Sequence, residues 1–325
     1  MRLGFSVRVV GKPGLRAYDG RRPQHWPHLS VSLAHLRDIF AYLRTTGIGM
    51  YRMSPDPTPY ATHPDWPALH DQIEECRTGL MELGTAVRLD GLRLSFHAPS
   101  HVALASADPV VVDRSIVLLG LLAGILDGMV LPPESVIVVH TGGLAGGVEA
   151  AIGRWTGAWD RLPSNVQRRV VLEHEDDGLT LPDALRIHAV TGVRVVFDYL
   201  HFLLNNPEGW ALRDSLQQAL ETWPVEVTPK VHFASPRTEL RAVQRLDERS
   251  GRPRWLLAPP RPGHHADFLN PWEFARLLEA GAGLRDFDVM LEAKAGDLAL
   301  LRLRADLQRY VPAVCFLLDP AEVPA

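Results

Sequence analysis

The sequence predicts an α/β fold, a single (β/α)8 or TIM barrel domain over residues 1–325. Short runs rich in Val, Leu, Ile and Phe alternate with longer stretches of helical period, the pattern of βαβ units around a parallel sheet. There are eight such runs, and 325 residues is a usual length for one barrel. No repeat period, low-complexity tract or Ser/Gly-rich linker divides the chain.

The expected strands are residues 3–7, 49–53, 92–97, 136–140, 170–174, 193–198, 229–233 and 288–293. After the first strand, apolar residues at spacings of three and four predict a helix that Ser30 or Ser32 caps and Gly47 ends. After the second, Pro64 is expected to open a helix and Gly84 to end it. Two long insertions, 7–29 and 234–270, follow strands and are expected to be irregular loops on the face where barrels keep their active sites.

Composition excludes several classes of protein. A hydrophobic fraction of 46% and a charged fraction of 22% are those of a globular protein with a full core. Only Cys76 and Cys315 are present, too few for a disulfide framework or a thiolate zinc site. The first residues lack the pattern of a signal peptide, and the most apolar stretch, 115–126, is shorter than the roughly 20 residues that span a bilayer. We therefore expect a cytoplasmic protein with no membrane association.

Metal-capable side chains stand at or next to the ends of six expected strands: His97, His140, Glu173, Asp198, His232 and Glu292. In a closed parallel barrel these positions converge on one pocket. Burying so many ionisable groups without a cation would cost several kcal/mol each, so their grouping predicts a metal site. Imidazole with carboxylate suits manganese, zinc or iron.

Two more donors lie close in sequence, His201 three residues after Asp198, and His265 in the segment Gly263 to Asp267. The number of donors exceeds what one ion needs. It predicts two or three divalent ions that share carboxylates, an arrangement suited to phosphodiester hydrolysis, in which ions lower the pKa of a water and neutralise the attacked phosphate.

Taken in order, the strand-end segments resemble the ultraviolet damage endonuclease family, repair nucleases that nick DNA on the 5′ side of a lesion. The resemblance covers nearly the whole chain. It rests on Arg2-Leu3-Gly4-Phe5, Tyr51-Arg52-Met53-Ser54, Leu94-Ser95-Phe96-His97, His140-Thr141-Gly142-Gly143, Leu172-Glu173-His174-Glu175-Asp176, Asp198-Tyr199-Leu200-His201, Lys230-Val231-His232, His265-Ala266-Asp267 and Glu292-Ala293-Lys294.

The resemblance implies a barrel with a cluster of two or three divalent ions, manganese first, with zinc, cobalt and magnesium as alternatives. The ligands it implies are His63, His97, His140, Glu173, Asp198, His201, His232, His265 and Glu292. It gives catalytic roles to Glu173, His232 and Lys230, with the Lys230 amine carboxylated so that it becomes an anion. The alternative for Lys230 is a lysine paired with a neighbouring carboxylate.

The chain departs from the family at the positions that probe the damaged duplex. The family places a Gln-Tyr pair after the third-strand histidine and a tyrosine near the end of the first strand, where this chain has Ser100, His101 and Phe5. An imidazole and a phenyl ring can still stack on bases. We expect these three residues and Arg8 to contact DNA. Basic residues of the two insertions are expected to form a positive groove on this acidic chain: Arg8, Lys12, Arg16, Arg21, Arg22, Arg252, Arg254 and Arg261.

The expected function is therefore a metal-dependent endonuclease that nicks damaged double-stranded DNA, at ultraviolet photoproducts and other lesions, immediately 5′ of the lesion. A water activated by the metal attacks the phosphate and leaves a 3′-hydroxyl and a 5′-phosphate. No obligate protein partner is expected. The alternatives are a metal-dependent sugar isomerase or epimerase, an apurinic-site endonuclease, and a DNA-binding relative without catalysis.

Overall fold

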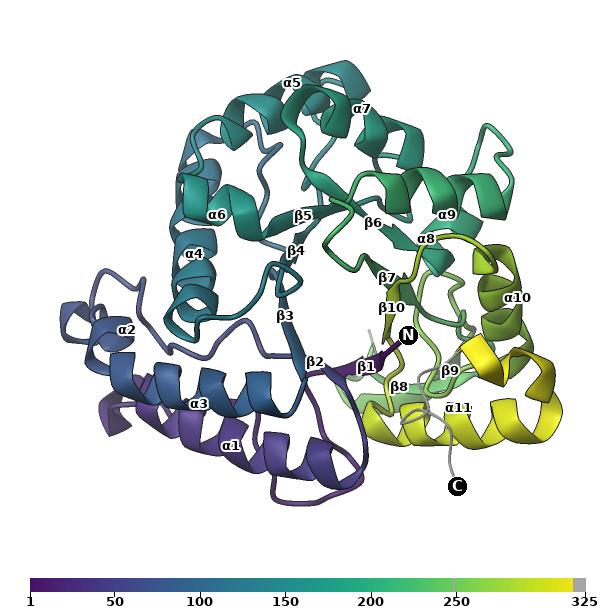
Figure 1. Cartoon of the computed structure of the whole chain (residues 1–325). Helices are drawn as coiled ribbons and strands as arrows, with labels where there is room; N and C mark the ends of the chain where they lie inside the picture. The colour runs from purple at the N-terminus through teal and green to yellow at the C-terminus, as the bar shows by residue number, and fades with distance from the viewer. Residues whose placement is uncertain (248, 318–325) are drawn as a thin grey trace.

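Eight parallel strands close into a barrel in the computed structural model, which describes residues 1–247 and 249–317 (Figure 1). Their order around the barrel is β1-β10-β7-β6-β5-β4-β3-β2, so β1 pairs with both β2 and β10. The predicted (β/α)8 fold is confirmed, and every expected strand is present. The strands are β1 (Leu3–Ser6), β2 (Met50–Arg52), β3 (Arg93–His97), β4 (Ile137–Val139), β5 (Val170–Glu173), β6 (Arg194–Asp198), β7 (Lys230–Phe233) and β10 (Asp288–Leu291).

Helices form a layer around the barrel (Figure 1). They are α1 (Leu29–Thr45), α2 (Gln72–Glu75), α3 (Arg77–Leu89), α4 (Pro109–Gly128), α5 (Val148–Trp159), α6 (Ser164–Arg169), α7 (Leu181–Thr191), α8 (Tyr199–Leu204), α9 (Leu212–Glu221), α10 (Pro271–Gly281) and α11 (Asp297–Tyr310), with short 3-10 turns η1 (Pro23–His25), η2 (Pro67–Leu69) and η3 (Pro312–Leu317).

Alternation along the strands sorts side chains between the helix layer and the barrel interior, because successive residues of a strand point to opposite faces. Phe5 is paired in register with Tyr51 and Leu291, and all three belong to the core under the helices. Valines that point to the other face of the sheet, in or next to β4, β5 and β6, form a separate buried cluster with Trp223 and Val227. The interior therefore has its own packing, and its last inward positions lie at the carboxyl ends of the strands.

The amino-terminal end of the barrel is closed by a buried ion pair. Arg93 is 1% exposed at its side chain, and its guanidinium lies 2.9 Å from the Asp288 carboxylate. Arg2 lies 2.9 Å from the same carboxylate and also donates to it through its backbone N–H. Burial opposes the charge on Asp288, but the two arginines lower its pKa below the usual value. These contacts tie β1, β3 and β10 together below the site.

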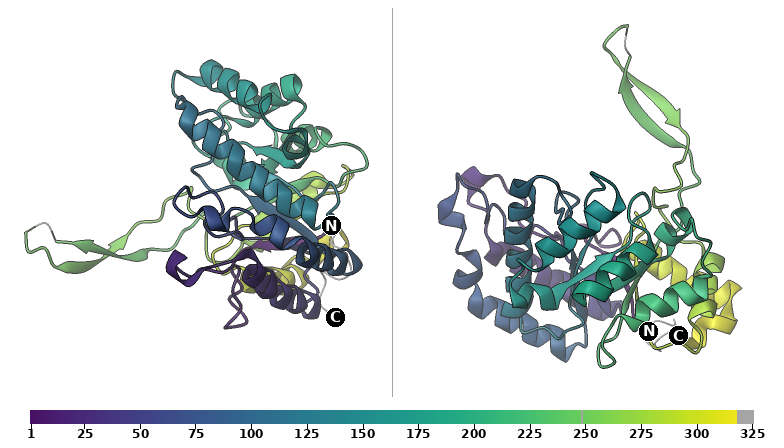
Figure 2. Two further views of the ribbon diagram at one scale, coloured as in Figure 1. Left: turned by 90° about the vertical axis from the view of Figure 1, so that its left-hand side faces the viewer. Right: turned by 90° about the horizontal axis from the view of Figure 1, so that it is seen from above.

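The insertion after β7 differs from the expected irregular loop. Residues 234–270 contain an antiparallel hairpin of β8 (Arg241–Leu246) and β9 (Pro253–Ala258). Figure 2 shows this hairpin standing clear of the barrel, on the side away from the two termini. Its strands bury almost no side chain, so the hydrophobic pattern that marks core strands is absent there.

Three local expectations about helices were also wrong. His28, not Ser30 or Ser32, caps α1, because its side chain accepts from the Ser30 N–H. Gly84 does not end a helix but lies inside α3, which continues to Leu89. The helix expected to open at Pro64 begins only at Gln72, after a short 3-10 turn.

The apolar stretch 115–126 is part of a longer helix than expected. Helix α4 has 20 residues and contains a window of 18 residues with mean hydropathy 2.0, and by length and composition it is the one helix among the described residues that is able to cross a membrane. It packs on α3, α6 and β4 within the helix layer, where Leu119, Leu122 and Leu126 are fully buried. Core helices of globular proteins meet the same criteria of length and hydropathy, so these criteria do not distinguish α4 from such a helix.

We predict that Gly84→Ala destabilises the fold. A Cβ at Gly84 would lie 1.9 Å from the carbonyl oxygen of Met129, backbone that cannot move without displacing the end of α4. The expected cost is about 1–3 kcal/mol, typical of overpacking. The measurement is denaturant unfolding of parent and variant.

The matched control is Gly153→Ala in α5, where an added Cβ meets nothing within 4 Å. That change is expected to stabilise the chain by about 0.5–1 kcal/mol, because alanine favours helix over glycine. Equal stability of the two variants would show that α3 does not approach Met129 so closely.

Candidate active site

Glu173, the last residue of β5, is fully buried and contacts four imidazoles with its two carboxylate oxygens. Oε1 lies 2.8 Å from Nδ1 of His232 and 3.6 Å from Nδ1 of His201. Oε2 lies 3.0 Å from Nε2 of His97 and 3.8 Å from Nε2 of His140. Side chains from β3, β7 and the segments after β4 and β6 thus meet on one carboxylate at the carboxyl end of the barrel.

Two other carboxylates complete this Glu173 cluster. Glu292, just after β10, lies 3.5 Å from Nδ1 of His232 and 3.7 Å from Nδ1 of His265. Asp198, the last residue of β6, lies 3.9 Å from Nδ1 of His201 and 4.0 Å from that of His232. The structure therefore brings together eight of the nine predicted ligands.

Three overlapping groups in the cluster have the spacing of a metal site, with ligand atoms within 4.8 Å of one another. The groups are His97, His140 and Glu173, then His97, His232 and Glu292, then Glu173, Asp198 and His201. Glu173 belongs to two groups, as a carboxylate that bridges neighbouring ions would, and His97 also lies within reach of two groups, although an imidazole nitrogen can ligate only one ion.

Buried polar atoms without partners fit this interpretation. Among the described residues, Asp198 Oδ2, His140 Nδ1 and His232 Nε2 are buried and have no hydrogen-bond partner. A buried polar atom left unpaired costs about 1–3 kcal/mol, and a carboxylate costs more. Oxygen and imidazole nitrogen donors are the set that manganese or zinc accepts, so the residues present fit divalent ions.

Burial and neighbouring charges shift the pKa values of the cluster residues in opposite directions. Burial raises the pKa of Asp198 to about 7, and the carboxylates of Glu173 and Glu292 add to the rise. Burial lowers the pKa of His232 to about 4 and also lowers that of His140, which keeps these imidazoles neutral, the form that ligates metals. Burial opposes ionisation of Glu173 as well, but the surrounding imidazoles hold its pKa well below the usual value.

Arg52 is a site residue that the sequence analysis missed. It ends β2, and its guanidinium forms an ion pair with Glu292. Burial opposes the charge on Glu292, yet Arg52 holds its pKa below the usual range. Arg52 stands at a strand end, as most residues of the cluster do, but a guanidinium does not ligate metals, so a pattern of metal-capable residues at strand ends does not include it.

Lys230 lies one layer below the cluster, because it begins β7 two residues before His232. The side chain is fully buried and its Nζ donates to Ser95 Oγ at 3.0 Å. Burial lowers the pKa of the amine well below its usual value, and Arg52 and Arg93 lower it further. Among the described residues no carboxylate lies within ion-pair distance of Nζ, so the expected alternative of a paired lysine is not what the structure has.

His63 lies apart from the cluster. It stands in the loop after β2 with its side chain 45% exposed, its Nδ1 accepts from the Asp65 N–H, and its ring lies against Tyr60. It belongs to none of the three groups. Ligation by His63 would require this loop to move and stays a prediction.

The residues expected to contact DNA are not placed alike. Ser100 and His101 are exposed in the loop after β3, and Arg8 is exposed just after β1. Phe5 is fully buried under the helix layer, where its ring packs edge-on against Tyr51 at 5.4 Å. The expected stacking of Phe5 on bases is therefore corrected, because odd positions of β1 point away from the barrel mouth.

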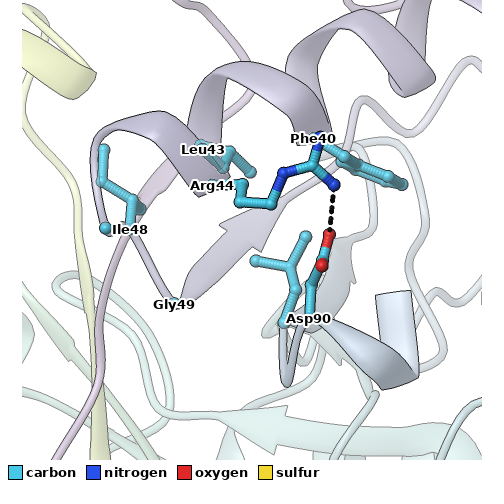
Figure 3. A pocket seen from close by; sticks show the side chains of 8 residues that line it. Phe40, Leu43, Arg44, Ile48, Gly49 and Asp90 are labelled. Carbon is cyan, nitrogen blue, oxygen red and sulfur yellow. Dashed lines mark hydrogen bonds and ion pairs between the residues drawn. The ribbon is translucent and has the colours of Figure 1, made fainter. Parts of the chain in front are cut away.

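A pocket at the other end of the barrel has none of the cluster residues. Figure 3 shows it between the end of α1 and the starts of β2 and β3, with an ion pair of 3.3 Å between Arg44 and Asp90 across it. Its lining is mostly aliphatic and aromatic: Phe40, Leu43, Arg44, Gly47, Ile48, Gly49, Asp90 and Leu92. The metal-capable residues gather at the opposite, carboxyl end.

The model of the family described as UV-endonuclease UvdE matches residues 28–316. The chain belongs to this family. The UvdE resemblance and the class of activity that it implies, a DNA repair endonuclease, are confirmed. The match takes in every residue of the Glu173 cluster.

Curated relatives and a solved structure agree with this assignment. A UV DNA damage endonuclease of Bacillus velezensis is 32% identical over 284 residues, 86% of this chain and 82% of the relative. One of Bacillus pumilus is 30% identical, over 80% of this chain and 75% of the relative. The crystal structure of SacUVDE matches with a TM-score of 0.77 at 26% identity, over 95% of this chain and 98% of that one.

Sugar epimerases resemble this UvdE chain in fold alone. A D-psicose 3-epimerase structure has a TM-score of 0.52 at 12% identity, over 98% of this chain and 99% of the other. A D-tagatose 3-epimerase-like protein has a TM-score of 0.53 at 15% identity, over 97% and 98%. The isomerase or epimerase alternative thus has support from the barrel and none from the family.

We predict that Glu173→Gln lowers the affinity for manganese by at least about 100-fold, because the change removes charge from the carboxylate that two groups of ligands share. The measurement is the metal content of purified protein after equilibration with manganese, by inductively coupled plasma spectrometry. The control is Glu149→Gln in α5, where the carboxylate is 78% exposed and paired with Arg186. Unchanged manganese content in Glu173→Gln would remove Glu173 from the ligand set.

Proposed function

We propose that this UvdE chain is a metal-dependent endonuclease that cleaves the phosphodiester bond immediately 5′ of a lesion in double-stranded DNA and leaves a 3′-hydroxyl and a 5′-phosphate. The observation that carries the proposal is the sharing of Glu173 by four imidazoles within three overlapping ligand groups. Such a set suits several ions close together, and a phosphate is the substrate group that requires them.

In this proposal the eight residues of the cluster would hold two or three divalent ions, manganese first. The chemistry that such ions would supply is a lower pKa for a bound water and neutralisation of charge on the attacked phosphate and the departing oxygen. The protein's part is geometric and electrostatic. Glu173 keeps four imidazoles oriented, Arg52 fixes one oxygen of Glu292, and His174 accepts from the Asp198 N–H at 3.0 Å to hold that carboxylate at the end of β6.

Lys230 is assigned the role of a further anionic ligand, through carboxylation of its amine. The support is its place directly below Glu173 and His232, its hydrogen bond to Ser95, and a depressed pKa that favours the uncharged amine. Carbon dioxide adds only to the uncharged amine, and a carboxylated side chain would supply negative charge where an ammonium would repel the ions.

We assign lesion recognition to the exposed loops around the mouth of the barrel. His101 lies in the loop after the cluster strand β3 and near Asp56, which follows β2; burial raises the pKa of the Asp56 carboxyl, and His101 offsets only part of that rise. An exposed imidazole with a neighbouring serine has room to stack on an unpaired or distorted base. Arg8 supplies a phosphate contact on the β1 side.

The proposed activity implies a binding partner and a location in the cell. Damaged double-stranded DNA is the proposed partner, with ultraviolet photoproducts as the first lesion and apurinic sites as a second. A cytoplasmic location, in contact with the chromosome, stays a prediction from the sequence.

The proposed function predicts nicking of an ultraviolet-irradiated duplex by the manganese-loaded protein and no nicking of its unirradiated twin. Chelation of the metal should abolish the activity. End-labelled strands resolved on a sequencing gel give the position of the nick, and ligation of the products tests for the 3′-hydroxyl and 5′-phosphate. Cleavage only of apurinic duplex would redirect the proposal to that lesion, and cleavage of neither would refute it.

His101→Ala is predicted to lower the ratio of nicking on damaged to undamaged duplex while manganese content stays at the parent level. Stacking of a base on an aromatic ring is worth about 1–3 kcal/mol, so a loss between about 5-fold and 100-fold is expected. Single-turnover rates on the two duplexes give the ratio. The same ratio in parent and variant would exclude His101 from lesion recognition.

A further inference from the structure

The hairpin of β8 and β9 has two chemically different faces. Pairing in register sets Arg245 opposite Arg254 and Arg241 opposite Ala258, so these arginines share one face. The other face carries three large apolar side chains that are each at least two-thirds exposed: Leu246, Trp255 and Leu257. Neither face is covered by the barrel (Figure 2).

The arginine face lacks anionic partners among the described residues. No ion pair among the described residues includes Arg241, Arg245 or Arg254. Like charges directly opposite one another on an antiparallel pair are destabilising, and Arg245 and Arg254 stand in that relation. An external anion would relieve the repulsion.

The segment around the hairpin concentrates positive charge in an acidic protein. Residues 237–261 include seven arginines and three acidic residues, a formal charge of +4 in a chain whose total is −4. Phosphate contacts supply most of the affinity of DNA-binding surfaces, and they require this local excess of cations.

A basic pocket joins the hairpin to the Glu173 cluster. It is lined by Arg237, Arg241, Gly263, His264, His265 and Lys294. Arg241 begins β8, while His265 lies 3.7 Å from Glu292. The two segments that connect the hairpin to the barrel are held together beside this pocket by the β-bridge between Pro236 and His265 and by a hydrogen bond from the Arg237 N–H to the His264 carbonyl oxygen. Cationic side chains thus run from the edge of the cluster out along the hairpin.

We propose that the hairpin is a DNA-binding arm whose arginine face and basal pocket hold the phosphate backbone of duplex DNA beside the nicked site. Each strand of six residues reaches about 20 Å, so the arm extends the contact over roughly six base pairs of flanking duplex. The inference rests on the proposed DNA substrate and adds the surface that positions it.

The test uses Arg241→Gln, Arg245→Gln and Arg254→Gln combined, in the full-length manganese-loaded protein. Binding to an undamaged fluorescent duplex of about 30 base pairs is followed by anisotropy over a range of salt. The salt dependence, as the slope of log affinity against log salt, should fall by about three, one for each phosphate contact. Affinity near physiological salt should fall by about 10-fold to 100-fold.

The matched control removes three exposed arginines from the outer helices, by Arg37→Gln, Arg77→Gln and Arg114→Gln combined. It changes the net charge equally and should keep the parent slope. A parental slope and affinity in the arm variant would overturn the proposal. Equal losses in both triple variants would do the same, because net charge alone would then explain the effect.

A further variant joins residues 239 and 260 through a short Gly-Ser turn and removes the hairpin. Sedimentation compares its mass with that of the parent. If the parent is a dimer, the shortened chain a monomer and DNA affinity unchanged, the apolar face is an interface between copies and the proposal fails. Because binding uses undamaged duplex, absence of nicking would refute the proposed function without affecting this test.

Discussion

The site depends on one buried carboxylate. Glu173 divides four imidazoles between its two oxygens, His232 and His201 on Oε1, His97 and His140 on Oε2. No local segment could make this arrangement, because the five residues come from β5 and from four other βα units that meet only when the barrel closes. The cluster is therefore a consequence of closure, and the cost of burying its charges falls on the whole fold. Divalent ions held by the cluster would offset that cost, and metal binding would then be coupled to stability.

The barrel interior is layered by chemistry as well as by geometry. Arg93 and Asp288 form the lowest layer, Lys230 and Ser95 the next, and the Glu173 cluster the uppermost. Valines occupy inward positions of β4 to β6 below Glu173 and Asp198 and exclude water from that side of the barrel. In the lowest layer the charges are balanced by an ion pair, and in the middle layer Nζ of Lys230 donates to Ser95 Oγ. Among the described residues, Nη2 of Arg93 is left without a partner in the lowest layer, whereas the top layer leaves a carboxylate oxygen of Asp198 and ring nitrogens of His140 and His232 without one, and these are atoms that can ligate a divalent ion.

The sequence predicted all eight strands, because core strands appear as apolar runs. It also predicted the eight residues of the cluster as candidate ligands: six stand at or next to the ends of those runs, and His201 and His265 lie in the segments that follow them. The sequence did not predict features that depend on which face of a strand a side chain points to, or on contacts between residues far apart in the chain. Phe5 was expected at the barrel mouth, yet a shift of one residue along β1 points a side chain into the helix layer. Arg52 was overlooked because its partner, Glu292, is 240 residues away. The hairpin escaped notice because neither of its faces meets a core, so its alternation of arginine and aliphatic residues does not resemble a buried strand.

Charge distribution resolves the conflict between an acidic chain and a polyanionic substrate. The chain as a whole carries −4, and the cluster at the carboxyl end of the barrel holds three carboxylates, so protein without bound cations would repel DNA at the place where the proposed function requires it to bind. Two sources of positive charge act at different ranges. In the proposed function, ions held by the cluster would neutralise the carboxylates and attract a single phosphate over a few ångströms, while arginines on the loops and the hairpin would attract the duplex over about 10 Å, the range that salt permits. Because the arginines that would attract the duplex lie on the hairpin, outside the barrel, they do not restrict which residues can occupy the barrel interior. The interior positions are therefore available for the residues that would ligate the ions.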